Sequence, residues 1–333
     1  MPKKKLQPVI YKDSWHAKAA KELYETLKKS IFEPLLKSLE EANTNAKVTA
    51  LERALRDGTI QYEHGRFRGK RSAAISKEIK ELGGRFRGGT WILPVPMLTT
   101  SLKKAIDLNK KAMKQLATQL NQKFDTMMAD TAALIQNITD LDEMNLVGIR
   151  NVSEEVKRSI HKELAVQPKL NPDAMERLKQ GYLVTDQLPI KLALAQKGEI
   201  RMKGAVIDFS QEVVEDLRTK LNDAIGSGRP RQEVRDIIMG KLHISKERCK
   251  FIARQETALM TTKFKAAQYT EFGMDTYEWR TVRDKNVRHT HQMLDRTIQD
   301  WNNPPVVDEK TQRRAQAGED YNCRCQAVPV VEW

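Results

Sequence analysis

Residues 277–282 read Tyr-Glu-Trp-Arg-Thr-Val, and their alternation of side chains predicts a β-strand. They follow a helical stretch that runs from about Ser245 to Phe272 and ends at Gly273. The remaining residues contain short apolar segments separated by loops, down to Val328–Val331. A long helix that leads into short strands predicts an α+β fold for this end of the chain.

The residues on both sides of this strand form an ordered series. Arg254-Gln255-Glu256 precedes it on the helix, and Trp279 and Thr281 lie in it. The later members are Asp284, Val287-Arg288-x-x-His291-x-x-Leu294-Asp295, Pro304-Pro305, Asn322-Cys323-Arg324-Cys325 and Pro329. The combination of W-x-T-x-x-D-x-x-V-R-x-x-H with C-R-C is specific, whereas either half alone is a weak signal.

This series, from about Leu217 to Pro329, resembles the C-terminal domain of phage Mu protein F-like minor head proteins, also called phage head morphogenesis proteins. The resemblance implies a minor capsid structural protein of a tailed phage, found in the virion at the head or portal vertex and in the host cytoplasm during assembly. It implies several copies per particle, which bind the portal protein, other head proteins and the procapsid interior. Contact with packaged double-stranded DNA and an influence on DNA ejection also follow from it.

The resemblance assigns a structural role to nine residues of the motif, which are Glu256, Trp279, Asp284, Arg288, His291, Asp295, Cys323, Arg324 and Cys325. Two positions depart from the family pattern. Arg296 stands where the family usually has glycine after the Leu-Asp pair, and His289 is an additional histidine. Both departures concern the conformation of that turn.

Two readings of the histidines and cysteines remain open. His289, His291, Cys323 and Cys325 together would suffice for a tetrahedral zinc site, although C-x-C and H-x-H are tighter spacings than the C-x-x-C of zinc ribbons. The two histidines would share a face in an extended segment. In the other reading, His291, Asp284 and Arg288 form hydrogen bonds and ion pairs that fix a loop-rich module, and the thiols pack as small apolar groups. Apart from this zinc, no cofactor is expected.

The competing functional class is an enzyme, either a metal-dependent nuclease or a toxin-like transferase delivered with the genome. A cysteine nucleophile would need an activated thiolate beside a base, and Arg324 is placed to lower the pKa of a thiol. The histidines and the Asn302-Asn303 pair do not have the spacing of an HNH nuclease. Arg254 and Glu256 are two residues apart and point to different faces of a helix. The favoured interpretation is therefore binding without catalysis.

The charge of the chain favours polyanionic partners. It has 333 residues with 58 Lys and Arg against 44 Asp and Glu, a net charge of +14. The pentapeptide Gly-Arg-Phe-Arg-Gly occurs twice, at Gly65–Gly69 and Gly84–Gly88, and is interpreted as two basic turns of a small α+β unit. Glycines on both sides allow close approach to a ligand, whereas in the alternative reading the phenylalanines are core residues between solvated arginines. The candidate DNA-binding residues are Arg66, Arg68, Lys70, Arg71, Arg85 and Arg87.

The overall prediction is an α+β, predominantly helical protein with a small strand-helix-strand unit near the N-terminus and a short-stranded, loop-rich C-terminal module. The expected domains are a helical segment (1–45), the basic α+β unit (46–98), a long helical region (99–170) and the head-morphogenesis domain (171–333). No apolar run is long enough for a membrane span, and no secretory signal is expected. Three cysteines cannot form a disulfide framework.

Overall fold

The computed structural model describes residues 3–5, 12, 14, 16–40, 49–164, 170–180 and 183–332. The chain forms two compact units. Unit 1 combines residues 1–23, 138–206 and 248–333, and unit 2 combines residues 24–137 and 207–247. The sequence also predicts a break at Asn43–Asn45 and a linker at Gln167–Pro172. The break and residues 167–169 of the linker lie outside the described residues, and Pro172 is the first residue of helix α7 (Pro172–Lys179).

The first helical segment buries the apolar stripe that its sequence predicts. Helix α1 (Ala17–Leu27) continues through a π-helical turn, η2 (Lys28–Phe32), into α2 (Glu33–Glu40). Ile31 and Leu35 are fully buried, and α2 packs against α5 (Thr100–Gln136). The sequence predicts that Pro34 kinks the helix or splits it in two. The structure has the π-helical turn there, ending at Phe32 two residues before Pro34, whose missing N–H interrupts regular α-helical hydrogen bonding.

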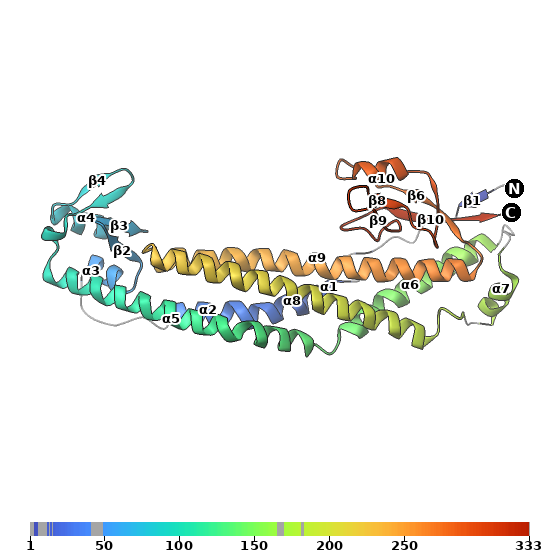
Figure 1. Cartoon of the computed structure of the whole chain (residues 1–333), viewed down its shortest axis with the longest axis horizontal. Helices are drawn as coiled ribbons and strands as arrows, with labels where there is room; N and C mark the ends of the chain where they lie inside the picture. The colour runs from blue at the N-terminus through green and yellow to red at the C-terminus, as the bar shows by residue number, and fades with distance from the viewer. Residues whose placement is uncertain are drawn as a thin grey trace. The chain divides into compact units, whose positions relative to one another are not determined.

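A small mixed region of unit 2 follows (Figure 1). Helices α3 (Ala50–Arg56) and α4 (Ala73–Glu81) accompany an antiparallel sheet with the spatial order β2-β3-β5-β4. Its strands are β2 (Ile60–Glu63), β3 (Arg66–Gly69), β4 (Arg85–Arg87) and β5 (Thr90–Ile92). The sequence predicts strands at Thr59–Tyr62 and Thr90–Leu93, and both are confirmed, as β2 and β5.

The two Gly-Arg-Phe-Arg-Gly copies are strands, so their interpretation as basic turns is wrong. The Arg-Phe-Arg core of each copy alternates charged and aromatic side chains, which is the period of a strand. Both copies pair with β5, through Phe67 opposite Trp91 and Phe86 opposite Trp91. The glycines occupy the strand ends and the turns beside them.

Four long helices contribute to the two units. They are α5, α6 (Leu141–Leu164), α8 (Leu188–Gly226) and α9 (Arg231–Glu271). Two shorter helices are η3 (Val95–Met97) and α7 (Pro172–Lys179). The helical region predicted from Leu102 onward is confirmed as α5 and α6.

The sequence predicts helices that begin at Ser210 and at about Ser245, and both predicted starts are wrong. Ser210 lies inside α8 and donates its hydroxyl hydrogen to the Ile207 carbonyl at 2.7 Å. Ser245 lies inside α9 and donates to the Lys241 carbonyl at 2.9 Å. A serine whose hydroxyl bonds to the preceding helical turn is satisfied in a helix interior and need not cap an N-terminus.

Unit 1 contains a second antiparallel sheet, with the order β1-β10-β6-β7. Its strands are β1 (Lys3–Lys5), β6 (Thr276–Arg280), β7 (Ile298–Asp300) and β10 (Gln326–Glu332). Strand β6 is the one predicted from the Tyr-Glu-Trp-Arg alternation. Its Tyr277 and Trp279 are fully buried beside Phe264 and Phe272 of α9 and its end. A two-stranded sheet, β8 (Val306–Asp308) and β9 (Arg313–Arg314), and helix α10 (His289–Leu294) complete the module.

The protein is thus α+β and predominantly helical, with small antiparallel sheets toward both ends of the sequence, as predicted. Within the described residues, no helix has the length and apolarity required to cross a membrane.

Candidate functional site

Helix α10 and the loop before β10 bring three potential metal ligands together. Nδ1 of His291 lies 3.6 Å from Sγ of Cys323 and 3.6 Å from Sγ of Cys325. His291 and Cys325 are buried and Cys323 is partly exposed. The backbone N–H of Cys325 donates to Sγ of Cys323 at 3.4 Å. We call His291, Cys323 and Cys325 the His-Cys cluster.

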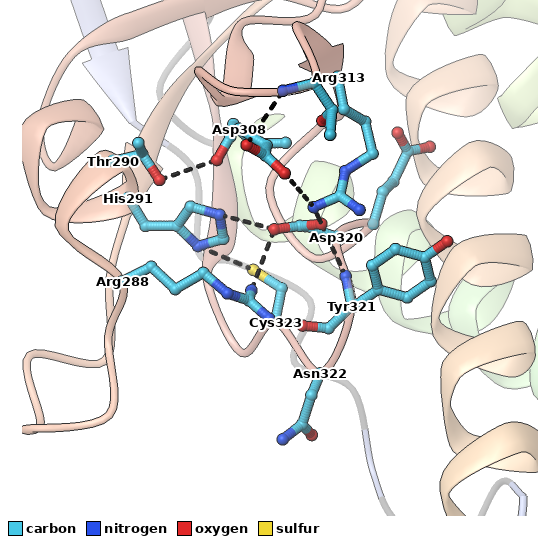
Figure 2. A network of polar contacts seen from close by, with 12 residues as sticks. Arg288, Thr290, His291, Asp308, Arg313, Asp320, Tyr321, Asn322 and Cys323 are labelled. Carbon is cyan, nitrogen blue, oxygen red and sulfur yellow. Dashed lines mark hydrogen bonds and ion pairs between the residues drawn. The ribbon is translucent and has the colours of Figure 1, made fainter.

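Asp320 fixes the orientation of the imidazole (Figure 2). Its Oδ2 atom lies 3.1 Å from Nε2 of His291 and accepts a hydrogen bond from Nη1 of Arg288 at 3.0 Å. Its Oδ1 atom pairs with Nη2 of Arg313 at 2.6 Å and accepts from the Tyr321 N–H at 2.8 Å. The Asp320 side chain is fully buried, and burial disfavours a charged carboxylate. The four hydrogen-bond donors around it offset this cost.

The surrounding elements hold both halves of the cluster. Thr290 donates to the Val307 carbonyl at 2.8 Å, which ties α10 to β8. On α9, Gln255 donates to the Glu319 carbonyl at 3.0 Å and accepts from the Asn322 N–H at 2.7 Å. The loop that carries Asp320 and Cys323 is therefore anchored to a long helix instead of depending on its own short turns.

The electrostatics of the cluster favour a thiolate beside an imidazolium. The hydrogen bond from Cys325, together with His291, lowers the pKa of Cys323 to about 5. Burial alone would lower the pKa of His291, but hydrogen bonds to Asp320 and Cys323 outweigh it and raise that pKa to about 9. The interaction with Cys323, together with burial, raises the pKa of Cys325, because a second negative charge beside the first thiolate is unfavourable.

A cavity of about 90 Å³ opens beside the cluster. It is lined by the three cluster residues and by Val282, Asn286, Val287, Arg288, Asn322 and Arg324. Its volume is sufficient for water or a small group, and it gives solvent access to the sulfur atoms.

The structure does not bring His289 into this cluster. His289 is exposed on the first turn of α10, whereas His291 is buried. The expectation that both imidazoles share one face assumed an extended segment. In a helix, residues two apart point to different faces, so only one of the two histidines can face the cysteines.

The other motif residues also lie in unit 1. Asp284 pairs with Arg324 at 2.6 Å, and Asp295 accepts the Thr281 N–H at 2.9 Å. Trp279 packs edge-on against His291, with ring centroids 5.3 Å apart. Glu256 pairs with Nε of Arg201 at 2.5 Å, a contact between α9 and α8.

Arg296, the departure from the family glycine, has a φ of 67°, in the left-handed region that glycine favours. Its N–H donates to the Trp279 carbonyl at 2.7 Å, and the Trp279 N–H donates to the Thr297 carbonyl at 2.9 Å. The turn therefore keeps the backbone conformation that a glycine would accept, and these hydrogen bonds help to hold a non-glycine residue in it.

Chemically, the cluster has two uses. A thiolate, an imidazole and a buried carboxylate in sequence, Cys323–His291–Asp320, is the arrangement of an activated nucleophile. Two sulfur atoms that lie equally far from one imidazole nitrogen are also, with that nitrogen, the donor set of a zinc site. The sequence pointed to His291 and both cysteines but missed Asp320 and Arg313. The one available signal was an acidic residue three positions before Cys323.

The candidate DNA-binding residues lie in unit 2, mainly on one face of the small sheet. Arg66 and Arg85 are both opposite Ile92 in the register, and directly opposite residues share a face. Arg68 and Arg87 lie two residues further along the same strands and so on the same side. All four are exposed. We call them the arginine face.

Lys70 and Arg71 differ from these four. Lys70 is exposed just after β3. Arg71 is half-buried and donates to the Phe67 carbonyl at 3.4 Å and to the Gly89 carbonyl at 3.2 Å. Its guanidinium also lies 5.9 Å from the centroid of Phe86. Arg71 therefore links the two repeat strands.

The C-terminal third of the chain matches a known protein family. Residues 215–328 match the family described as phage Mu protein F like protein, which confirms the resemblance found in the motif. A stretch of 88 residues is 31% identical to an uncharacterized protein of Haemophilus influenzae, covering 26% of this chain and 18% of that protein. The match thus spans less than a fifth of this relative. No solved structure matches the chain.

Proposed function

We propose that the protein is a minor head protein of a tailed phage that acts in head assembly, binds the portal or the procapsid interior, and contacts packaged DNA. The observation that carries this proposal is the match of residues 215–328 to the phage Mu protein F-like family, which points to phage head morphogenesis. Its mechanism is binding without catalysis, and its location is the virion.

The arginine face supplies the proposed DNA contact. Arg66 and Arg68 on β3 and Arg85 and Arg87 on β4 form a two-by-two array, with β5 between the strands. Guanidinium groups bind phosphate oxygens through paired N–H donors. Such contacts carry no sequence information, which suits a protein that must accept any packaged genome sequence.

Salt dependence tests the DNA contact. Replacing the four arginines with glutamine should reduce affinity for duplex DNA, and the slope of log K against log salt concentration should become shallower by about 0.9 for each phosphate that is no longer neutralised. The matched control replaces four exposed lysines of α5 with glutamine, removing the same charge, and these are Lys103, Lys104, Lys110 and Lys111. An equal fall in affinity in both variants would show that only the net charge matters. It would contradict the proposal that the arginine face is the DNA-binding surface.

Exposed apolar side chains on α5 supply the proposed contact with portal or head proteins. Leu108 is 46% exposed and Leu134 is 48% exposed. Purified chain and purified portal protein should migrate together in analytical ultracentrifugation, and Leu108→Glu with Leu134→Glu should separate them. Retention of the complex in the double variant would exclude this surface, and failure of the unaltered chain to bind would exclude the portal as partner.

The competing enzyme class is supported by one observation, the Cys323–His291–Asp320 arrangement. We expect the chain to leave supercoiled plasmid intact in the presence of Mg²⁺, Mn²⁺ or Zn²⁺. If the chain cleaved the plasmid, and His291→Ala abolished this cleavage without changing the circular dichroism spectrum, the protein would be a nuclease and the structural role would be rejected.

A further inference from the structure

The His-Cys cluster has the separations that a shared metal ion requires. Zinc bonds sulfur at about 2.3 Å and imidazole nitrogen at about 2.0–2.1 Å, with tetrahedral angles, which places sulfur and nitrogen ligands about 3.5 Å apart. The two measured Sγ to Nδ1 distances are both 3.6 Å. All three ligand atoms lie within 4.8 Å of one another.

The outer contacts of the imidazole also fit a metal ligand. A ligating histidine usually donates its other ring N–H to a carboxylate, which fixes the tautomer and the ring orientation. Here Nδ1 faces the sulfur atoms, and Nε2 lies 3.1 Å from Oδ2 of Asp320. Asp320 is itself held by Arg288 and Arg313, so the carboxylate stays charged and in place.

We propose that His291, Cys323 and Cys325 bind one Zn²⁺ ion through Nδ1 and two thiolate sulfurs. The adjoining cavity supplies the fourth position, which water fills. Both sulfurs bind as thiolates and the imidazole binds through an unprotonated Nδ1, and the protons that the ion displaces from these atoms pass to solvent. Zinc is favoured over harder cations because the donors are nitrogen and sulfur. This zinc site does not depend on the head-assembly assignment.

Cys325 distinguishes the zinc site from a catalytic thiol. A nucleophile needs only one sulfur beside the base. The cluster instead places a second, buried sulfur at the same 3.6 Å from the same nitrogen. The Cys325 N–H also donates to Sγ of Cys323, an interaction that stabilises a thiolate ligand.

Cobalt substitution tests the proposal on the full, unaltered chain. After treatment with a chelator under reducing conditions, one equivalent of Co²⁺ should produce the near-ultraviolet thiolate charge-transfer band and the visible bands of tetrahedral cobalt. Zn²⁺ should then bleach both at one equivalent. Absence of these bands, together with zinc content well below one ion per chain after reconstitution, would overturn the proposal.

Variants locate the site. Cys323→Ser and Cys325→Ser should each weaken the charge-transfer band, and Asp320→Asn should lower zinc affinity by about 10–100-fold. The matched controls are Cys249→Ala, which changes the third cysteine, and His289→Asn, which changes the exposed neighbouring histidine. Loss of the cobalt spectrum in either control would place the ion elsewhere.

Thiol chemistry separates the remaining outcomes. Zinc should protect Cys323 from alkylation in the native chain. Alkylation at the same rate with and without saturating Zn²⁺ would identify a free reactive thiolate. A mass lower by two hydrogen atoms in the isolated chain, restored by reductant without any metal uptake, would identify a Cys323–Cys325 disulfide. Either result would overturn the zinc site and leave the head-assembly proposal to its own tests.

Discussion

Phe67 and Phe86 occupy the same place in two identical pentapeptides, yet Phe67 is fully buried and Phe86 is 60% exposed. The register explains the difference. Tyr62, Phe67, Trp91 and Phe86 lie opposite one another across β2, β3, β5 and β4 and share one face of the sheet. Strand β3 is interior and β4 is at the edge, so the same side chain meets the core in one copy and mostly solvent in the other.

Position in the sheet, more than local sequence, therefore decides what each copy of the repeated motif contributes. In the first copy the aromatic ring belongs to the hydrophobic core with Leu55 and Ile79. In the second copy the ring packs edge-on against Trp91, with centroids 5.6 Å apart. The arginines, in contrast, face outward in both copies, because strand alternation places them opposite the rings.

Alanine substitution of the two phenylalanines should produce the largest difference between the copies. Phe67→Ala should lower the free energy of unfolding of unit 2 by about 3–5 kcal/mol, because it leaves a cavity in the core. Phe86→Ala should cost about 1 kcal/mol, mostly the aromatic pair with Trp91. Hydrogen exchange of the β2–β5 amides in the full chain measures both. Equal destabilisation would show that the edge strand carries as much of the core as the interior one.

The last glycine of each copy should produce the next largest difference. Gly69 has a φ of 117°, and a Cβ there would lie 2.3 Å from the Thr59 carbonyl oxygen. Gly88 has a φ of 57° and has open space around it. Gly69→Ala should therefore destabilise unit 2 by about 2–3 kcal/mol, and Gly88→Ala by about 1 kcal/mol. The melting temperatures of the two variants, measured at the same protein concentration and in the same buffer, show which substitution is more destabilising.

Arg71 connects the two copies, and its replacement should have a smaller effect. Arg71→Met keeps most of the apolar stem and removes the hydrogen bonds to the Phe67 and Gly89 carbonyls, which should cost about 1 kcal/mol. Arg85→Met on β4 is the matched control and should cost less than about 0.5 kcal/mol. A larger cost in the control would mean that the exposed arginines stabilise the sheet, contrary to their outward position.

The paired arginines should have the smallest effect on stability. Arg66→Gln with Arg68→Gln, and Arg85→Gln with Arg87→Gln, should each change the free energy of unfolding by about 0.5 kcal/mol or less. The first pair should have the slightly larger effect, because Arg68 donates to the Ser227 carbonyl at 3.1 Å. Denaturant titration checks this. If these variants lost several kcal/mol of stability, weaker DNA binding could result from unfolding. It could then not be attributed to the missing arginine side chains.

Most helices could be predicted from apolar periodicity, because the buried side chains of an amphipathic helix recur every three to four residues in the sequence. Leu23, Leu27 and Ile31 are examples, and all are fully buried. Helix ends were less predictable. Serine is a residue type that is common at helix N-caps, but α8 and α9 continue through Ser210 and Ser245 because of tertiary packing. The residue type alone does not reveal that packing.

The candidate site was predictable in composition and not in geometry. The sequence order identified His291, Cys323 and Cys325, and the structure brings them together. It could not exclude His289, because that depends on α10 being helical. It also missed Asp320, whose importance comes from the meeting of α10, β9 and the Tyr321 loop. Acidic residues are common in such loops, so Asp320 had no distinguishing pattern.

Strand β1 has a consequence for how the protein is made. It pairs with β10, with Lys3, Lys4 and Lys5 opposite Glu332, Val331 and Val330. The hydrophobic core of the mixed region of unit 2, in contrast, lies within residues 51–106. On the ribosome this region can condense once residue 106 has emerged, whereas β1 cannot pair with β10 until residues 330–332 have been synthesised.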